Sequence, residues 1–475
     1  MKSLSHAPLA VLMMTAVLAG CAALPAPSRD VPALAAPATP AQWQTPLPHD
    51  GSVTDLTRWW QQFDDPLLAE LITNAQTASP TLASARSRIE QARATRVASG
   101  AALGPTLNAG ASASRGKQDL SVPVGTALSA NLQAGWELDL FGANAAARDA
   151  AQARLDGAQA NWHDARVSVA AEVASSYLAL RACEAQLAQT QLDSHSRSET
   201  ARLTDLTAKA GFQSPSNAAL ARASAAQGNA NLAQQRASCE LGVKGLVALT
   251  GLAEPALRER LATATARIPQ PAQIAVAQVP AEALAQRPDV YSAGRELVAA
   301  SADVSQAQAQ RLPSISLAGS IGPARFETGA GSASGTLWSI GPVAVSVPLF
   351  DGGRRRANTA AAQARYDEAV AVYQGKLRSS VREVEEALVG LQSTSERSGD
   401  AQAASDGFEA SYRATEARYK GGLASLFELE DARRTAVQAQ AALIDLKRER
   451  VATWIALYRA LGGGWSASTP QDVAS

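Results

Sequence analysis

The stretch Ser129-Ala-Asn-Leu-Gln-Ala-Gly-Trp-Glu-Leu-Asp-Leu140 decides how this chain folds. One set of alternate positions in it is apolar: Ala130, Leu132, Ala134, Trp136, Leu138 and Leu140. The other set is polar or small: Asn131, Gln133, Gly135, Glu137 and Asp139. Because successive side chains of a β-strand point to opposite faces, this two-residue period predicts an amphipathic strand over residues 129–140. Phe141-Gly142 ends the pattern, and an Ala-rich helical segment follows.

A second strand of the same kind lies near the other end of the chain. Val343, Val345, Val347 and Leu349 alternate there with Ala344, Ser346 and Pro348. Phe350-Asp351-Gly352-Gly353 closes this strand, and another long helical segment begins. The chain therefore contains two amphipathic strands that each lead into a long helix.

Four pairs of residues that mark the ends of predicted helices or strands recur at nearly the same spacing. The pairs are Pro105 and Pro313, Phe141 and Phe350, Gly211 and Gly421, and Gly251 and Gly462, at offsets of 208, 209, 210 and 211. Four matches in the same order indicate a tandem duplication. The predicted fold is mainly α with a small β part, built from two copies of a helix-strand-strand-helix unit.

The duplication sets the expected domain bounds. The first repeat covers residues 61–251, with strands at 105–114 and 129–140 and a hairpin turn near Gly211. The second covers 280–464, with strands at 313–321 and 337–349 and a turn near Gly421. The Gly- and Ser-rich segments 115–128 and 322–336 are expected to be loops. A linker at 252–279 joins the repeats, and 465–475 forms a tail.

Long helices give each repeat its dimensions. About 65 residues without Pro run from Ala145 to Ala210, which is roughly 95 Å of helix at 1.5 Å per residue. Gly211 breaks this helix, and a second one returns from about Ser216 to Leu249. The second repeat repeats the pattern over Thr359–Lys420 and Leu423–Leu461. Each repeat is thus expected to form an elongated helical hairpin that needs neighbours along its length.

The N-terminus has the features of a secretory signal over residues 1–20. Lys2 precedes a short apolar run that ends in Leu18-Ala19-Gly20-Cys21. This ending resembles a bacterial lipoprotein signal, which would leave a lipid on Cys21. A Pro- and Ala-rich tether follows, so residues 21–60 are expected to hold the tether and the start of the equatorial region.

The two remaining cysteines, Cys183 and Cys239, each lie 28 residues from Gly211. A hairpin that turns at Gly211 brings them to the same height on adjacent helices, which predicts a disulfide between them. The alternative is a pair of buried thiols that act as small apolar side chains.

Several functions are disfavoured. The formal net charge is zero, so no broad basic face for nucleic acid is expected. The histidines of the mature chain show no metal-ligand spacing, and there is no phosphate-binding loop or nucleophile elbow. We therefore expect neither an enzyme nor a cofactor or metal.

Four amphipathic strands cannot close a membrane barrel, because known barrels begin at about eight strands. An open sheet edge in lipid would leave backbone groups unpaired. Other copies of the chain must complete the sheet, and three copies would give a barrel of twelve strands. The alternation places Trp136, Leu138 and Leu140 toward lipid, and Glu137 and Asp139 toward water. The alternative is the edge of a soluble β-sandwich.

These features together resemble the TolC-type outer membrane factor family, in its lipoprotein (NodT/OprM-like) efflux branch. The resemblance covers nearly the whole mature chain and is carried by the duplicated unit and three motifs. They are Trp136-Glu137-Leu138-Asp139-Leu140-Phe141-Gly142, Pro348-Leu349-Phe350-Asp351-Gly352-Gly353 and Tyr419-Lys420-Gly421-Gly422-Leu423-Ala424-Ser425. It implies a homotrimer whose outer membrane β-barrel continues into a long periplasmic α-helical barrel. It further implies docking to a periplasmic membrane-fusion adaptor and an inner-membrane pump of the resistance-nodulation-division type, with export of drugs, other small molecules or metal ions.

The resemblance also implies roles for the hairpin ends. Gly422, Leu423 and Ser425 match the family's adaptor-docking motif, and Gly211, Phe212 and Ser214 are their counterparts in the first repeat. Phe427 and Asp431 would form an apolar and an acidic ring at the periplasmic gate, four residues apart on one helix face. For Asp431 the alternative is a solvated acid near a helix start.

The arginine cluster after the second strand pair and the function of the chain each allow more than one interpretation. Arg354-Arg355-Arg356 could face the anionic inner leaflet of the outer membrane, neighbouring acids or solvent. The function could also be that of a type I protein-secretion channel, or of a lipid-anchored periplasmic coiled-coil scaffold without a pore.

Overall fold

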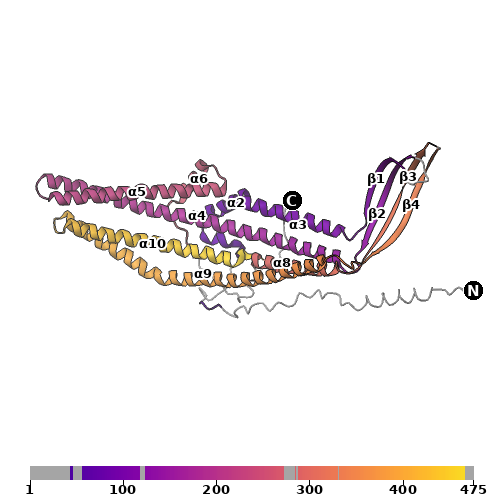
Figure 1. Cartoon of the computed structure of the whole chain (residues 1–475). Coiled ribbons are helices and arrows are strands. Elements are labelled where there is room, and N and C mark those ends of the chain that lie inside the picture. The colour runs from indigo at the N-terminus through magenta and orange to yellow at the C-terminus, as the bar shows by residue number, and fades with distance from the viewer. Residues whose placement is uncertain are drawn as a thin grey trace, which may run out of the picture. The chain divides into compact units, whose positions relative to one another are not determined.

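The structure of the chain is a computed structural model, drawn in Figure 1. It describes residues 43–45, 56–117, 124–271, 284, 287–329 and 331–465. Cys21, the predicted signal segment and most of the predicted tether and tail lie outside these residues. In chain order the elements before the first long helix are η2 (Leu56–Phe63), α2 (Pro66–Ala78), α3 (Pro80–Ala101), β1 (Thr106–Gly116) and β2 (Gly125–Leu138).

The two long hairpins and the second pair of strands follow. The remaining elements are α4 (Ala143–Lys209), α5 (Pro215–Thr250), α6 (Glu254–Leu261), η3 (Ala262–Ala264), α8 (Pro288–Ala309), β3 (Ser314–Thr328), β4 (Gly331–Ser346), α9 (Arg354–Lys420), α10 (Leu426–Ala460) and η4 (Gly462–Gly464). The described chain divides into two compact units. The first contains the strands and the adjoining helix ends, and the second contains most of the helical hairpins.

The first unit is built on a four-stranded antiparallel sheet in the order β1-β2-β3-β4. Directly paired residues share a face, and the register pairs Leu107 with Ala134, Leu132 with Ile321, and Ile321 with Trp338. One face is therefore mostly apolar across all four strands, with Arg115 and Arg325 on it only near the end where β1 connects to β2 and β3 to β4. Its large exposed apolar side chains are Leu107, Leu128, Leu132, Trp136, Leu317, Ile321, Trp338, Ile340, Val343 and Val345.

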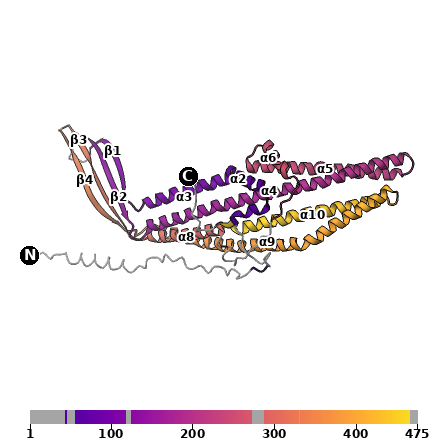
Figure 2. The same ribbon diagram turned by 180° about the vertical axis from the view of Figure 1, so that it is seen from behind.

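The opposite face of the sheet is mostly polar or small. Gln133 pairs there with Ser320, and hydroxyl contacts join Ser112 to Ser129 at 2.8 Å and Ser320 to Ser339 at 2.9 Å. Among the described residues no element covers either face, as Figure 2 also shows from behind. The sheet is thus a single amphipathic layer with two unpaired edges, β1 and β4.

A β-bulge keeps the apolar face continuous on β4. Leu317 pairs with Val343, but two residues further along β3, Gly319 pairs with Ile340, three residues back along β4. The extra residue shifts the alternation by one. Odd-numbered Val343 and even-numbered Ile340 and Trp338 therefore lie on the same face. A strict alternation through β4 would have placed Trp338 and Ile340 on the polar side.

The strands differ from the predicted bounds, most clearly at the β3–β4 connection. Residues 322–336 were expected to be a loop, but Phe326 pairs with Ala333 and the ladder continues to Thr328 and Gly331. A Gly- and Ser-rich composition is typical of loops. The backbone N–H and C=O groups of these residues nevertheless form sheet hydrogen bonds as well as those of other residues. At the other end, Asp139 lies just beyond β2. Its carboxylate accepts hydrogen bonds from the backbone N–H groups of Asn144 and Ala145, at 3.0 and 2.7 Å, and so caps α4 instead of facing water.

The helical segment before the first strand is divided into two helices, α2 and α3. Pro80 has no N–H to donate, so α2 ends before it and α3 begins at it. The helix expected from Thr359 starts earlier, at Arg354, because Asp351 accepts from the Gly353 and Arg355 N–H groups. Long helices α4 and α9 are 67 residues each, which corresponds to roughly 100 Å. No described helix combines the length and the apolar character needed to cross a bilayer.

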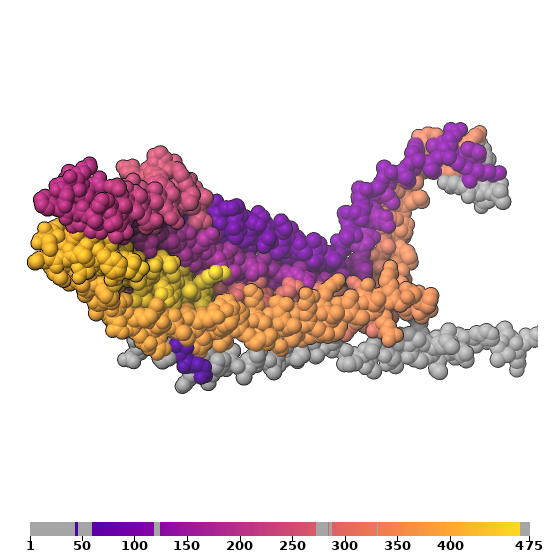
Figure 3. All heavy atoms as spheres, turned by 60° about the vertical axis from the view of Figure 1, so that its left-hand side comes forward, coloured from indigo at the N-terminus to yellow at the C-terminus, as the bar shows by residue number. Residues whose placement is uncertain are grey.

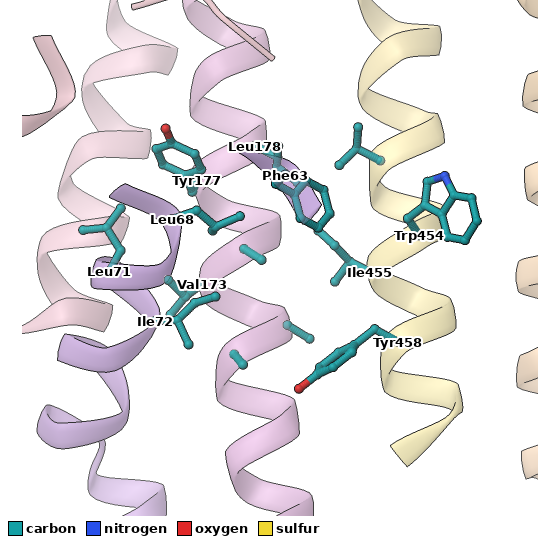
Figure 4. Close-up of a cluster of buried hydrophobic side chains, with 14 of the residues drawn as sticks. Phe63, Leu68, Leu71, Ile72, Val173, Tyr177, Leu178, Trp454, Ile455 and Tyr458 are labelled. Carbon is teal, nitrogen blue, oxygen red and sulfur yellow. The ribbon is translucent and has the colours of Figure 1, made fainter. Parts of the chain in front are cut away.

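The core of the second unit lies where η2 and α2 pack against α4 and α10 (Figure 4). Trp59 is fully buried, with its ring centroid 6.1 Å from that of Trp454 and 5.4 Å from that of Tyr458. Tyr177 of α4 is also fully buried and donates a hydrogen bond of 2.6 Å to Asp65, the N-cap of α2. This cluster holds the two hairpins together at the end opposite to their turns.

Candidate functional site at the hairpin ends

The two hairpin turns have the same backbone geometry. In the first, the Phe212 N–H donates to the Thr207 carbonyl at 2.9 Å, and the Gly211 N–H donates to Ala208 at 3.0 Å. These are the two hydrogen bonds of a Schellman motif, and Gly211 occupies its left-handed position with φ +82°. The predicted turn at Gly211 therefore has a specific backbone requirement that only Gly meets without strain.

The second turn repeats this motif one residue later than its predicted centre. Leu423 donates to the Arg418 carbonyl at 2.8 Å and Gly422 donates to Tyr419 at 3.0 Å. Here the left-handed residue is Gly422, with φ +72°, rather than Gly421. The duplication thus extends to the hydrogen bonds of the turns.

The apolar residue of each turn is exposed. In many Schellman motifs this residue folds back on its own helix. Here 83% of Phe212 and 74% of Leu423 remain accessible. The two turns lie side by side at one end of the second unit, in magenta and yellow in Figure 3. Each turn therefore presents an uncovered apolar side chain at the same end of the unit.

Serine caps begin the returning helices. Ser214 accepts from the Asn217 N–H at 3.2 Å. Ser425 accepts from the Glu428 N–H at 3.1 Å, and Glu428 accepts from the Ser425 N–H at 2.6 Å, which completes a capping box. The hydrogen bonds from Ser425 hold the pKa of Glu428 below its ordinary value. Ser425 is therefore the N-cap of α10, and Glu428 is the third residue of the helix and the other member of the capping box.

Phe427 and Asp431 lie on the exposed side of α10. Phe427 is 72% accessible, and the Asp431 carboxylate forms an ion pair with Arg434 one turn later in the same helix. Both side chains are free to meet groups from outside the protomer. The Arg434 guanidinium sits beside the predicted acidic ring position, and the sequence reasoning did not anticipate it.

A buried ionic network joins the two hairpins just behind this surface. The Arg433 side chain is only 1% accessible and pairs with Glu430, which is 15% accessible. Glu430 also accepts a hydrogen bond of 2.7 Å from Ser224 of α5 and lies 3.4 Å from Arg197 of α4. Arg433 donates in turn to Thr200 of α4 at 3.0 Å. One carboxylate and one guanidinium of α10 thus hold both helices of the first hairpin.

Two tyrosines of α9 add hydroxyl contacts to α4. The Tyr412 hydroxyl lies 2.8 Å from that of Ser196, and the Tyr419 hydroxyl lies 3.0 Å from that of Thr204. A cavity of about 460 Å³ opens beside them, lined by residues of α4, α9 and α10. The contacts between hairpins near the turns therefore combine these polar pairs with a small apolar cluster, in which Leu426 and Leu429 of α10 pack on alanines of α4 and α5. Those at the other end are mainly apolar.

Hydrogen bonds and ion pairs can break and re-form with a modest net change in free energy, so a polar contact permits two packings of the hairpins. The sequence analysis did not identify the network. Its only local signal is the three-residue spacing of Glu430 and Arg433, which marks an i,i+3 pair but does not reveal the partners on α4 and α5.

The structure brings Cys183 and Cys239 together. Their Sγ atoms are 2.05 Å apart and their Cα atoms 5.6 Å apart, which is the geometry of a disulfide. The bond links α4 to α5 well behind the first turn. Cys239 is buried and Cys183 packs against the same apolar core.

The chain belongs to the outer membrane efflux protein family, whose sequence model matches residues 71–252 and 279–463. The matched segments fall in the two repeats. With the exposed amphipathic sheet and the long hairpins, this membership makes the chain an outer membrane efflux channel that extends into the periplasm. The family consists of channel proteins rather than enzymes.

Characterised relatives agree over nearly their whole length. The chain is 31% identical over 447 residues to the pyoverdine export outer membrane protein OpmQ of Pseudomonas putida, covering 91% of this chain and 93% of that protein. It is 29% identical to the outer membrane protein OprJ of Pseudomonas aeruginosa, covering 96% and 95%. It is also 29% identical to the toluene efflux pump outer membrane protein TtgI of P. putida, covering 97% and 98%.

Solved structures share the fold. The outer-membrane channel OprN superposes with a TM-score of 0.80 at 28% identity, covering 90% of this chain and 98% of that one. The outer membrane protein VceC of Vibrio cholerae superposes with a TM-score of 0.74 at 27% identity, covering 87% and 100%. The TolC-like fold expected from the sequence is therefore confirmed.

Proposed function

We propose that three copies of this chain form the outer membrane conduit of a tripartite efflux system. The observation that carries this proposal is the sheet, which has four strands, one continuous apolar face and two unpaired edges. In a bilayer the edge N–H and C=O groups must be paired, so β1 of one copy would pair with β4 of the next. Three copies give a closed barrel of twelve strands, within the range of known outer membrane barrels.

The apolar face of this barrel would look toward lipid. Leu132, Trp338 and Ile340 on that face are all large and exposed. The serine and amide side chains of the other face would line a water-filled pore. A lipid on Cys21 would add a second attachment to the outer membrane. Stable anchoring takes two such attachments, which the barrel and the lipid would supply.

The hairpin ends would dock a periplasmic membrane-fusion adaptor. Phe212 and Leu423 offer apolar contacts that this chain leaves uncovered. Gly211, Gly422 and the capping serines Ser214 and Ser425 keep the surface around them small, so that a helical hairpin of the adaptor could approach closely. The adaptor would couple the channel to an inner-membrane transporter of the resistance-nodulation-division type. Relatives named for pyoverdine, solvent and toluene export support small molecules as the exported class.

Phe427 and Asp431 would narrow the periplasmic end of the pore. Three copies of each side chain would form an apolar and an acidic ring near the axis. Because rings of carboxylates attract cations, the pore would be cation-selective when nearly closed. Arg434 reduces the charge of this ring, so a Arg434→Ala channel should be more cation-selective than the natural one.

Reconstitution of the purified full-length chain in planar bilayers tests the channel. We expect trimers in detergent and single-channel currents, and Asp431→Ala should raise the conductance. Unchanged conductance would reject the role of Asp431 but not the channel. Absence of pores under any opening condition would instead favour a scaffold without a pore.

A deletion strain tests the exported class. Loss of the gene should sensitise cells to drugs or solvents while protein secretion continues. Loss of protein secretion with unchanged drug sensitivity would favour a type I secretion channel.

A further inference from the structure

We infer that the sheet-to-helix junction holds a binding site for the phosphate headgroup of an anionic phospholipid in the inner leaflet of the outer membrane. The inference rests on the proposed orientation of the apolar sheet face toward lipid. It goes further in naming a lipid class and the side chains that select it. Arg354 and Arg356, at the start of α9, carry the site.

The apolar surface ends at this junction. Leu349 and Phe350, which follow β4, are 91% and 93% accessible, and Leu140, which follows β2, is 61% accessible. Trp136 lies near the same end of β2 and donates its indole N–H to the Leu103 carbonyl at 3.0 Å. Aromatic residues with one polar group are typical of the boundary between acyl chains and headgroups. The headgroup level therefore falls at residues 349–356.

Two guanidinium groups stand at that level without an ion pair. Arg354 and Arg356 are exposed, and within the described part of the chain neither forms a salt bridge. Arg355, between them, differs because it pairs with Asp351 at 3.5 Å. Positive charges in the first turn of a helix are unfavourable to the helix dipole. Asp351 attracts Arg354 electrostatically but forms its ion pair with Arg355, so a phosphate at the membrane surface would compensate the two exposed charges more fully.

A cavity at the junction connects Arg354 to the apolar surface. It has a volume of about 350 Å³, and Arg354 and Arg355 line it together with Leu138, Leu140 and Pro348. This lining offers a guanidinium for a phosphate oxygen and apolar side chains for the adjoining glycerol and acyl carbons. Arginine suits this role because its planar fork can bind two phosphate oxygens at once.

Two carboxylates also line the cavity, but neither opposes the site. Both oxygens of Asp139 accept from the α4 N–H groups of Asn144 and Ala145. Glu137 pairs with Ser316 in the sheet register and so belongs to the polar face, opposite to Leu138. The negative charge of Glu137 therefore lies toward the proposed pore, whereas Arg354 lines the cavity from the start of α9 together with Leu138 and Leu140.

Native mass spectrometry of the full-length protein in detergent tests the site, with dioleoyl phosphatidylglycerol or dioleoyl phosphatidylcholine added. The natural protein should bind phosphatidylglycerol the more tightly. A basic side chain near an anionic membrane surface contributes about a fivefold change in affinity, so Arg354→Gln/Arg356→Gln should weaken phosphatidylglycerol binding about 25-fold. The control Arg236→Gln removes an exposed arginine of α5 and should change the affinity less than about twofold.

Further measurements separate a loss of charge from a loss of folding, and lipid binding from the binding of free anions. The variant Arg354→Lys/Arg356→Lys should fold and keep most of the preference for phosphatidylglycerol. It tests the site even if the Gln variant does not assemble. Equal affinity of the natural protein for both lipids, or full retention of affinity in the Gln variant, would overturn the site. Displacement of the lipid by inorganic phosphate alone would also overturn it. Because the same sample can be assayed for single-channel current, a conducting protein without lipid preference would reject this inference and leave the channel intact.

Discussion

Replacement of Glu430 by Gln tests whether the ionic network holds the two hairpins together near their turns. Gln is nearly the same shape as Glu and keeps an oxygen that can accept from Ser224, but it removes the charge that compensates buried Arg433. Removal of one partner from a buried ion pair costs about 3–5 kcal/mol. Because Glu430 is partly accessible and some hydrogen bonds survive, we expect about 2–3 kcal/mol of local destabilisation.

Hydrogen exchange of peptides covering residues 426–437 measures this local stability in the assembled protein. A loss of about 2–3 kcal/mol corresponds to roughly 30- to 150-fold faster exchange where the local opening equilibrium sets the exchange rate. The matched control is Glu386→Gln in α9, whose partner Arg382 forms an exposed i,i+4 pair with both side chains 60% accessible. That change should cost less than about 0.5 kcal/mol.

A double variant distinguishes the ion pair from other effects of the substitution. Arg433→Met removes the buried charge, so Glu430→Gln in that background should cost at least about 1 kcal/mol less than alone. Equal acceleration of exchange in the Glu430 and Glu386 variants would refute the network as the link between hairpins. Additive effects of the Glu430 and Arg433 changes would also refute it.

Three further predictions follow from the second unit. Cys183→Ser/Cys239→Ser should lower the stability of the first hairpin by up to about 4 kcal/mol, the chain-entropy value for a loop of this length, and faster proteolysis of α5 would reveal it. Trp59→Ala should cost about 3–5 kcal/mol because the buried indole leaves a cavity, which thermal unfolding measures. Burial lowers the pKa of His163 to about 4, so the unfolded chain binds a proton between pH 6.5 and 4 that the folded ring does not. Stability should therefore fall as the pH drops through this window, and His163→Gln should remove on the order of 1 kcal/mol of that loss, allowing for the partial exposure of the ring.

The sequence contained the signals for the repeated architecture because those signals are local. Alternation over residues 129–140 identified β2, and the glycines near 211 and 421 identified the hairpin turns. The equal distances of Cys183 and Cys239 from Gly211 anticipated their contact. Each of these inferences needs only the period of a strand, the rise of a helix or the backbone freedom of Gly.

The features that the sequence did not reveal depend on partners far along the chain. Whether segment 322–336 is a loop or a ladder depends on pairing across β2, β3 and β4, and its own composition favours a loop. The side that Trp338 faces depends on a bulge opposite Gly319, which a strict alternation along β4 cannot detect. The role of Glu430 has no signal in the local sequence, because its partners on α4 and α5 are more than 200 residues away.

The two hairpins are constrained differently, and this difference limits how the periplasmic end can change. Within the first hairpin, the disulfide ties α4 to α5, so these helices keep their relative position behind the turn. Between the hairpins, the contacts near the turns are the Glu430–Arg433 network, the tyrosine hydroxyls of α9 and a small cluster around Leu426 and Leu429. Trp59 and its neighbours form a larger apolar core at the opposite end. Polar contacts exchange for water at little net cost, whereas separation of the buried aromatic cluster would expose a large apolar area. Movement of α9 and α10 against the first hairpin would therefore separate the polar contacts and the small cluster around Leu426 and Leu429 at a lower cost than the aromatic core, and would pivot near that core. Loss of Glu430 should consequently ease this movement, and in the proposed channel it should widen the periplasmic end.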